Sequence, residues 1–532
     1  MTATPHTAEV ARRRTFAIIS HPDAGKTTLT EKLLLFSGAI HVAGSVKARK
    51  ASRHATSDWM EIEKQRGISV ASSVMQMLYR EHVINLLDTP GHRDFSEDTY
   101  RVLTAVDSAL MVIDAANGVE AQTKRLIEVC RQRDTPIMTF VNKMDREGRD
   151  PIELLDEIEA ELGMPCVPMT WPVGQGKAFG GIINLRTQTM RVFQPGEDTV
   201  EASAAEEIPL SDTATLKARF GADFEHAMAN IELLSGVSPA FDREAFLAAK
   251  QTPVFFGSAV NNFGVQEVLD ALVDLAPPPH PRASSNADGS LTEIAPDAEG
   301  FSGVVFKVQA NMDPQHRDRI AFVRVCSGKY ASGMKLKVVR SGKEMRPTSV
   351  VTFLSQRREA VDEAYAGDII GFTIHGGVQL GDTITDGASL QFTGLPFFAP
   401  ELFQTVELKN PLKSKQLQQG LAQLGEEGAI QVFKPQLGSL MLLGAVGQLQ
   451  FEVVQHRLAT EYKADIALKG SQFVGARWVT CDDPAEMKKF MDYNAAKLAY
   501  DAADTLAYLL TSNYDLRLTQ ERHPKIQFHP LR

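Results

Sequence analysis

The sequence predicts a multidomain chain in which an α/β domain with a parallel sheet precedes a β-barrel and then an α+β domain. Up to about residue 275, short apolar runs alternate with helical patterns, as in parallel α/β sheets. After a proline-rich segment at 276–281, short alternating strands are separated by Gly and Asp, which is typical of a small barrel. Beyond residue 396, strand and helix patterns mix again.

Length and composition set limits on the class of protein. The 532 residues correspond to three or four domains at roughly 150 residues each. No apolar stretch approaches the ~20 residues that cross a bilayer, so we expect a cytoplasmic protein without a membrane partner.

The four cysteines are widely scattered, which favours reduced thiols over disulfides or zinc. A net charge of -10 gives no global sign of nucleic-acid binding, but it does not exclude RNA.

Five buried runs are predicted as strands of the first sheet, at 16–20, 83–87, 109–113, 137–141 and 254–257. Each run is followed by a polar or Gly-containing loop. In open α/β sheets, ligands bind outside the carboxyl ends of the strands. We therefore expect the chemistry of the protein in these loops.

A phosphate-binding loop is predicted where the first strand ends and a helical pattern begins. Backbone N–H groups there converge on phosphate oxygens, the Lys26 ammonium adds charge at the β and γ oxygens, and the Thr27 hydroxyl can ligate Mg²⁺. Ser20 stands where the strict motif has Gly. The residues predicted to line this loop are Ser20, His21, Pro22, Asp23, Ala24, Gly25, Lys26 and Thr27.

A second phosphate motif, DTPGH, follows the run at 83–87. The Asp88 carboxylate can hold Mg²⁺ through water, and the Gly91 N–H can meet a γ-phosphate. His92 can orient the attacking water once its ring is pushed towards that phosphate, so it is the predicted catalytic residue. The predicted contacts of this motif are Asp88, Thr89, Pro90, Gly91 and His92.

A base-reading loop is predicted at Asn142, Lys143, Met144 and Asp145. The Asp145 carboxylate can accept two hydrogen bonds from guanine N1–H and N2–H₂, a pair that adenine lacks. At ~1.5–3 kcal/mol each, two such bonds select guanine by at least ~100-fold, so GTP and GDP with Mg²⁺ are the predicted cofactors.

Ser258 and Ala259 follow the last predicted strand. They are predicted to bring a backbone N–H near guanine O6. In the alternative interpretation, Ser258 is a loop serine that caps the next helix.

A nucleotide-sensing switch is predicted between the two phosphate motifs, at Arg66, Gly67, Ile68 and Ser69. The Ser69 hydroxyl could cap Mg²⁺ and the γ-phosphate and be released on hydrolysis. The alternative is a solvated loop that turns into a strand. The predicted metal ligands are thus Thr27 and Ser69, with Asp88 acting through water.

Four segments together resemble the translational GTPases, the family of elongation factors Tu and G: SHPDAGKTT, RGIS, DTPGH and NKMD. In that family, PGH carries the water-orienting histidine. The resemblance spans nearly the whole chain and extends to GAVGQLQFE, which is similar to a segment of domain III of elongation factor G. The expected domains are a GTP-binding domain at 1–280 with an insertion at about 165–250, a linker at 281–295, a β-barrel domain II at 296–395 and an α+β domain III at 396–532.

The resemblance also implies a function. Elongation factor G has two further domains for which this chain has no room, so a translocase is not favoured. The Ser-His-Pro-Asp opening and Ser69, where elongation factors usually carry threonine, resemble the members that act in termination. This implies a ribosome-dependent GTPase that promotes dissociation and recycling of class I peptide chain release factors after peptide release, and that is a monomer off the ribosome.

Other functions stay open at the level of sequence. One is a ribosome-binding module that uses GTP only as a structural ligand. Another is a metabolic enzyme that couples GTP to group transfer, although no second constellation of titratable residues supports it. Within the family, a translocase or a ribosome-protection factor also stays open.

Overall fold

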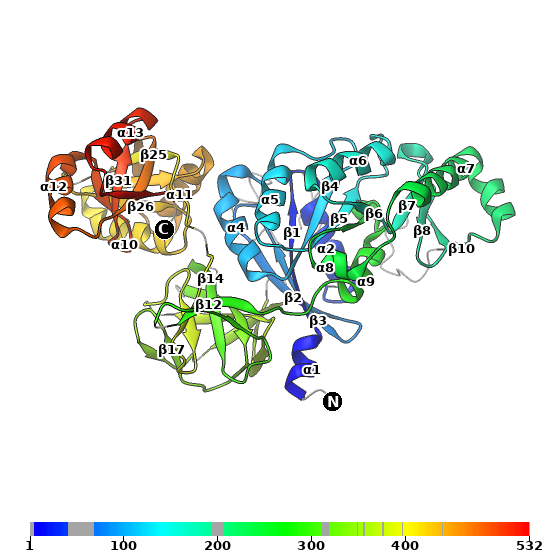
Figure 1. The fold of residues 1–532 in the computed structure, drawn as a ribbon, viewed down its shortest axis with the longest axis horizontal. Helices are drawn as coiled ribbons and strands as arrows, with labels where there is room; N and C mark the ends of the chain where they lie inside the picture. Colours follow the sequence, from blue (N-terminus) through cyan, green and yellow to red (C-terminus); the bar gives the residue numbers. More distant parts are fainter. Residues whose placement is uncertain are drawn as a thin grey trace.

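The computed structural model describes residues 5–40, 69–193, 206–286, 288–310, 319–347, 349–354, 357–374, 377–395, 397–438 and 440–530. Figure 1 shows three bodies: a large α/β domain in blue to green, a barrel in green to yellow, and a third domain in yellow to red. The predicted succession of α/β, β-barrel and α+β folds is confirmed. Within the described ranges, no helix is both long and apolar enough to cross a membrane.

A seven-stranded sheet forms the centre of the α/β domain, in the order β2–β3–β1–β4–β5–β11–β6. Its strands are parallel except for β2, which pairs antiparallel with β3 at the edge. The strands are β1 (Arg13–Ser20), β2 (Ser73–Tyr79), β3 (His82–Asp88), β4 (Ser108–Asp114), β5 (Ile137–Asn142), β6 (Cys166–Pro168) and β11 (Thr252–Phe256). All five predicted strands are among them.

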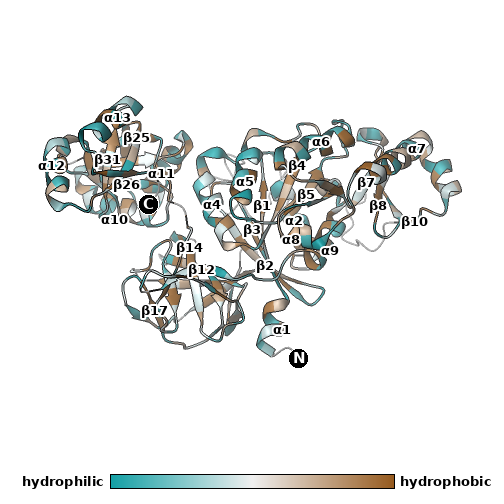
Figure 2. Cartoon of the chain, in the orientation of Figure 1, coloured by the Kyte–Doolittle hydropathy of each residue, from teal (hydrophilic) through white to brown (hydrophobic). Residues whose placement is uncertain are grey.

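Helices cover both faces of this sheet because alternate strand residues point to opposite sides. In β1, Ala17 and Ile19 join the cluster of the α4–α6 face, whereas Phe16 and Ile18 join that of α2 and α9. Figure 2 shows the apolar residues concentrated in the strands and the inner helix faces. The helices of this domain are α1 (Pro5–Ala11), α2 (Lys26–Phe36), α4 (Ser96–Ala105), α5 (Ala121–Arg131), α6 (Pro151–Leu162), α8 (Arg243–Leu247) and α9 (Val265–Asp274).

Between β6 and β11, the chain forms a separate antiparallel sheet in the order β10–β9–β8–β7. Its strands are β7 (Thr170–Val173), β8 (Gly181–Asn184), β9 (Thr189–Val192) and β10 (Glu207–Pro209), and α7 (Thr213–Val237) packs against β7. This unit extends away from the barrel and the third domain (Figure 1).

The second domain is built on an eight-stranded antiparallel sheet, in the order β18–β17–β23–β14–β15–β22–β19–β20. Its strands are β14 (Ser302–Ala310), β15 (Arg319–Ser327), β17 (Leu336–Val338), β18 (Glu344–Met345), β19 (Val350–Leu354), β20 (Arg357–Ala360), β22 (Ile369–Ile374) and β23 (Thr383–Thr385). A further pair joins β16 (Lys329–Ala331) to β21 (Glu363–Tyr365).

The linker predicted at 281–295 is wrong. β12 (Arg282–Asn286) and β13 (Leu291–Ile294) pair antiparallel there, and β12 also pairs with β24 (Leu390–Phe392). The prolines at 276–281 and the small polar residues after them suggested a linker, but sheet pairing uses backbone groups and does not require apolar side chains. The buried Ser284 hydroxyl, for example, hydrogen-bonds across the hairpin to Thr292.

The third domain has an eight-stranded sheet in the order β28–β25–β27–β26–β30–β31–β29–β32. The strands are β25 (Leu402–Leu408), β26 (Gln431–Pro435), β27 (Leu442–Ala445), β28 (Ile466–Gly470), β29 (Gly475–Thr480), β30 (Leu498–Tyr500), β31 (Leu506–Leu510) and β32 (Gln527–His529). The helices are α10 (Ser414–Glu426), α11 (Gln448–Thr460), α12 (Pro484–Asn494) and α13 (Asn513–Arg522).

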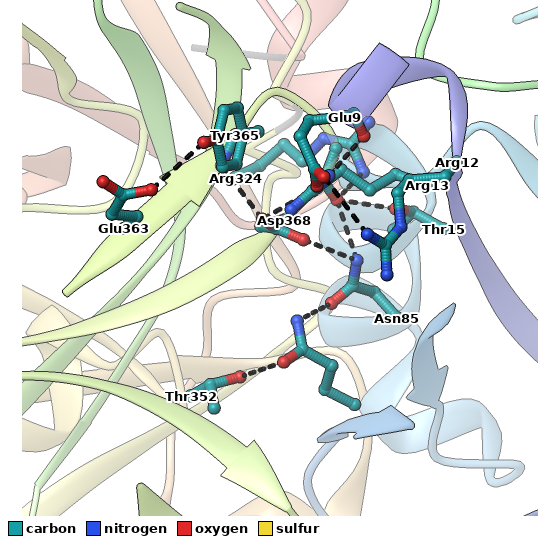
Figure 3. A network of polar contacts seen from close by, with 12 residues as sticks. Glu9, Arg12, Arg13, Thr15, Asn85, Arg324, Thr352, Glu363, Tyr365 and Asp368 are labelled. Atoms are coloured by element: carbon teal, nitrogen blue, oxygen red, sulfur yellow. Dashed lines mark hydrogen bonds and ion pairs between the residues drawn. The ribbon is translucent and has the colours of Figure 1, made fainter. Parts of the chain in front are cut away.

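One backbone carbonyl of the barrel anchors it to the α/β domain. The Gly367 carbonyl accepts from the Thr15 hydroxyl at 2.6 Å, from Asn85 Nδ2 at 3.2 Å and from Arg324 Nη1 at 2.8 Å. Next to it, Arg13 Nε donates to Asp368 Oδ2 at 2.9 Å, and both side chains are nearly buried. Figure 3 shows Arg13, Thr15 and Asn85 of the α/β domain beside Arg324 and Asp368 of the barrel.

A second buried ionic cluster surrounds Asp107, just before β4. Its carboxylate lies 2.6 Å from Arg324 Nη2, 3.0 Å from His280 Nδ1 and 3.4 Å from Arg282 Nη2. Burial disfavours the charge, but Arg324, His280 and Arg282 outweigh that effect and hold the pKa of Asp107 below its usual range. The Asp107 carboxylate therefore stays ionised at neutral pH, and the cluster joins the barrel to the α/β domain.

We predict that Asp107→Asn lowers the melting temperature of the first two domains. The change leaves Arg324 and Arg282 buried without a counter-charge, which costs about 3 kcal/mol or more. Because the folded pKa of Asp107 is depressed, its stabilisation is complete above about pH 5 and is lost as the pH falls below that value. Calorimetry at pH 7 measures the effect of the substitution, and a series from about pH 7 down to about pH 2 measures the loss in the wild type. As a control, Glu344→Gln removes the exposed pair with Lys335 and should leave the melting temperature unchanged; an equal drop in both variants contradicts the prediction.

Candidate nucleotide-binding site

The predicted phosphate loop runs from the end of β1 to the start of α2. Asp23 and Gly25 both have left-handed backbone conformations, at φ 64° and 99°, which turn the chain into the helix. The Ser20 hydroxyl is buried and donates to the His21 carbonyl at 2.9 Å, so it is satisfied within the loop. Thr27 is half-buried in the first turn of α2.

Lys26 joins this loop to the DTPGH motif. Its ammonium lies 2.7 Å from Asp88 Oδ1, and both side chains are nearly buried. Asp88 ends β3, which runs beside β1 in parallel register. The second carboxylate oxygen, Oδ2, is buried and has no hydrogen-bond partner among the described residues. The pairing therefore leaves one acceptor available next to the phosphate loop.

The Asn142 amide connects the phosphate loop to the last loop of the site. Its Nδ2 donates to the Ala24 carbonyl at 2.9 Å, and its Oδ1 accepts from the Ala259 backbone N–H at 2.9 Å. Gly25 packs so closely that a Cβ there would lie 2.2 Å from Asn142 Nδ2. These contacts require both the amide and the glycine.

Lys143 makes a similar connection with a residue that the sequence analysis missed. Its ammonium donates to the Asp23 carbonyl at 2.6 Å and to Asp114 Oδ2 at 2.7 Å. Asp114 ends β4, so it stands at the carboxyl edge like the residues that were found. Its position directly after the buried run at 109–113 is the signal that could have identified it.

Asp145 and Ser258 lie together. The Ser258 hydroxyl donates to Asp145 Oδ1 at 2.6 Å and accepts from Asn261 Nδ2 at 2.9 Å. It makes no helix-capping bond, which disfavours the alternative interpretation of Ser258. The backbone N–H groups of Ser258 and Ala259 already donate to Phe263 and Asn142, so the contact of either with guanine O6 stays a prediction.

The DTPGH motif also packs tightly against the phosphate loop. A Cβ on Gly91 would lie 3.2 Å from the Pro22 nitrogen, and the Thr89 hydroxyl donates to the Ile18 carbonyl at 2.7 Å. His92 caps the short helix η1 (Arg93–Phe95), with its Nδ1 accepting from the Asp94 N–H at 3.2 Å. The His92 contacts described here are with η1, so its catalytic role stays a prediction.

The predicted switch lies largely outside the described part of the chain. Arg66, Gly67 and Ile68 are not among the described residues, and Ser69 is half-buried at the edge of the described range. Its role as a metal ligand stays a prediction.

The site brings together the chemistry of one class of protein. A buried lysine of a phosphate loop pairs with the aspartate that ends the neighbouring strand, and an Asn-Lys-Met-Asp loop is bonded to the same phosphate loop. This arrangement on a mainly parallel sheet defines a P-loop protein that binds guanine nucleotide.

Three family models match successive parts of the chain. They are the elongation factor Tu GTP binding domain at 11–278, elongation factor G domain 2 at 300–387, and the class II release factor RF3 C-terminal domain at 392–520. The first match makes the chain a GTPase of the translational type.

Curated relatives narrow this class further. Peptide chain release factor 3 of Bordetella pertussis is 67% identical over 98% of this chain and 97% of its own length, and that of Nitrosomonas europaea is 65% identical with the same coverage. The chain belongs to the peptide chain release factor 3 family. A solved structure from Thermus thermophilus shares the fold, with a TM-score of 0.69 and 24% identity over 89% of this chain and 71% of the other.

We predict that Gly25→Ala weakens GDP and GTP binding at least ~10-fold, equivalent to about 1.4 kcal/mol. The added Cβ would collide with Asn142 Nδ2 and separate the phosphate loop from the base-reading loop. Titration with a fluorescent GDP analogue measures the affinity. Gly38→Ala is the matched control, because Gly38 also has a positive φ but open space around it. Equal losses in both variants would indicate backbone strain rather than the collision.

Proposed function

We propose that this chain is a ribosome-dependent GTPase that promotes dissociation and recycling of class I peptide chain release factors after peptide release. The observation that carries the proposal is the match of residues 392–520 to the C-terminal domain of class II release factors. The first two domains are shared with elongation factors, whereas the third distinguishes this chain from them. We also propose that the protein is cytoplasmic, that it is a monomer when it is not bound to the ribosome, and that it has no membrane partner.

Guanine selection is proposed to depend on Asp145. The Ser258 hydroxyl fixes one carboxylate oxygen, which favours an orientation in which the carboxylate can meet guanine N1–H and N2–H₂. The proposed GTP contacts are those of the three motifs: Ser20, His21, Pro22, Asp23, Ala24, Gly25, Lys26, Thr27, Asp88, Thr89, Pro90, Gly91, His92, Asn142, Lys143, Met144 and Asp145, with Ser258 and Ala259 near the base.

The residues present fit Mg²⁺ beside the phosphates. Asp88 Oδ2 is a buried acceptor without a partner in the described structure, and Thr27 lies at the start of α2. Thr27 and Ser69 are the proposed ligands, with Asp88 acting through water. When bound, the ion neutralises charge on the phosphate oxygens.

His92 is proposed to orient the attacking water. It follows Gly91, which packs on Pro22 of the phosphate loop, so a change of the His92 rotamer can bring the ring towards the γ-phosphate. Binding to the ribosome would favour that rotamer, which makes hydrolysis dependent on the ribosome.

We predict that Asp145→Asn shifts the preference of the protein from guanine to xanthine nucleotides. The amide cannot accept both guanine donors, but it can pair with the carbonyl oxygen of xanthine. Competition binding with GDP and XDP measures the ratio of affinities. Ser258→Ala is the matched control: losing one hydrogen bond to the carboxylate should weaken binding by about 1 kcal/mol without changing the preference. Retained guanine selectivity in Asp145→Asn counts against the assignment.

The function itself is tested on termination complexes that carry a labelled class I factor. We expect the wild-type chain with GTP to accelerate departure of the factor. His92→Ala should bind GTP normally but lose ribosome-stimulated turnover by about 10²–10⁴-fold. If the wild-type chain does not accelerate departure, the proposed function is wrong. Equal turnover with and without ribosomes would instead favour GTP as a structural ligand.

A further inference from the structure

Asp94 contacts both His92 and the third domain. Its backbone N–H donates to His92 Nδ1 at 3.2 Å, and its Oδ1 lies 3.5 Å from the same ring nitrogen. Its other carboxylate oxygen, Oδ2, accepts from the Leu449 N–H at 2.8 Å in the first turn of α11. One residue therefore touches the predicted catalytic ring and a helix 355 positions away in the chain.

The start of α11 is shaped to receive this carboxylate. A Cβ on Gly447 would lie 1.9 Å from Asp94 Cγ, so no other residue fits there while Asp94 is in place. The φ of Gly447 is -145°, an extended conformation open to any residue. The glycine is thus required by the approach of Asp94 and not by the backbone.

The hydrogen bonds of this helix terminus are divided between two acceptors. Gln450 Oε1 accepts from the N–H groups of Val446 and Gly447, while Asp94 takes that of Leu449. A carboxylate at a helix N-terminus is also favoured by the helix dipole. Asp94 therefore holds α11 by a charge-assisted hydrogen bond rather than by chance proximity.

An apolar contact next to Asp94 reaches the end of the predicted switch. Phe95 packs in one cluster with Val70, Val453 and Leu449. Val70 follows Ser69, and Val453 and Leu449 belong to α11. The same face of α11 thus touches segments on both sides of the site where the γ-phosphate is expected.

Among the described residues, the other polar contacts between these domains do not involve His92. Arg93 pairs with Glu401 at 3.1 Å, but more than half of each side chain is exposed, so the pair contributes little. Gln431 Nε2 donates to Glu97 Oε1 at 3.1 Å, on the helix beyond η1. Asp94, by contrast, contacts both α11 and the His92 ring.

We propose that Asp94 is a positioning residue through which the third domain controls His92. While α11 holds the Asp94 carboxylate, His92 stays as the cap of η1. When the third domain moves away, Asp94 and η1 are released, and the ring becomes free to turn towards the γ-phosphate. This inference rests on the proposed role of His92 in hydrolysis.

The test is Gly447→Ala in the full chain, because this substitution lies in the third domain and displaces the Asp94 carboxylate while the sequence of the GTPase domain stays unchanged. We expect single-turnover GTP hydrolysis without ribosomes to rise about tenfold, as one charge-assisted hydrogen bond no longer holds the inactive arrangement. GDP affinity should not change. In the double variant with His92→Ala, the rise should disappear. The matched control is Gly470→Ala, in β28 of the same domain, where a Cβ meets open space and the rate should stay at the wild-type value.

Asp94→Ala tests the same contact if Gly447→Ala does not fold, and it should raise the rate similarly. Asp94→Asn keeps an acceptor for the Leu449 N–H and should remain closer to the wild type. The inference is overturned if neither Gly447→Ala nor Asp94→Ala changes the rate, or if the rise persists without His92. A failure of the proposed function is distinguishable, since His92→Ala alone would then leave ribosome-stimulated turnover intact.

Discussion

The side-chain amide of Asn142 holds the nucleotide site together. Parallel strands bring their carboxyl ends to one edge of a sheet, but they do not fix the loops beyond that edge. The amide does so by bonding the phosphate loop through Ala24 and the last loop through Ala259. Because Asn142 is buried, losing either bond would leave a polar group unsatisfied, at a cost of about 1–3 kcal/mol. Lys26 and Asp88 extend the same arrangement to the DTPGH motif.

The sequence was sufficient to predict the site residues that lie at strand ends within recognisable motifs. It was not sufficient to predict contacts between segments that are distant in the chain. Asn142 and Asp145 were identified because each lies at or just beyond a strand end in a recognisable motif. Asp114 occupies an equivalent position, but without a motif it was missed. The contact of Asp94 with α11 spans 355 positions and leaves no local pattern. The strands β12 and β13 were predicted to be a linker, because their pairing depends on backbone hydrogen bonds and a polar composition does not indicate such pairing.

Ser20 shows how one departure from a motif can be accommodated. The strict phosphate loop begins with glycine, which tolerates unusual backbone angles. Here Ser20 is the last residue of β1 and has no positive φ, and its hydroxyl is satisfied by the His21 carbonyl. The left-handed turns fall instead on Asp23 and Gly25. A serine at the first position therefore does not loosen the loop, because the conformational demand lies later in it.

The Gly367 network of the barrel and the α11 contact of the third domain meet the main sheet at opposite ends of its strands, which gives these two contacts different relations to the nucleotide. The barrel also has a contact near the carboxyl ends, where Lys307 donates to Ser72. The barrel network around Gly367 includes Arg13 and Thr15, at the amino end of β1. The third domain instead contacts η1, just after the DTPGH motif at the carboxyl edge. If His92 acts as proposed, a change at the γ-phosphate would reach α11 through His92 and Asp94, whereas the Gly367 network lies at the other end of β1. This geometry favours the third domain over that network as the partner that responds to hydrolysis.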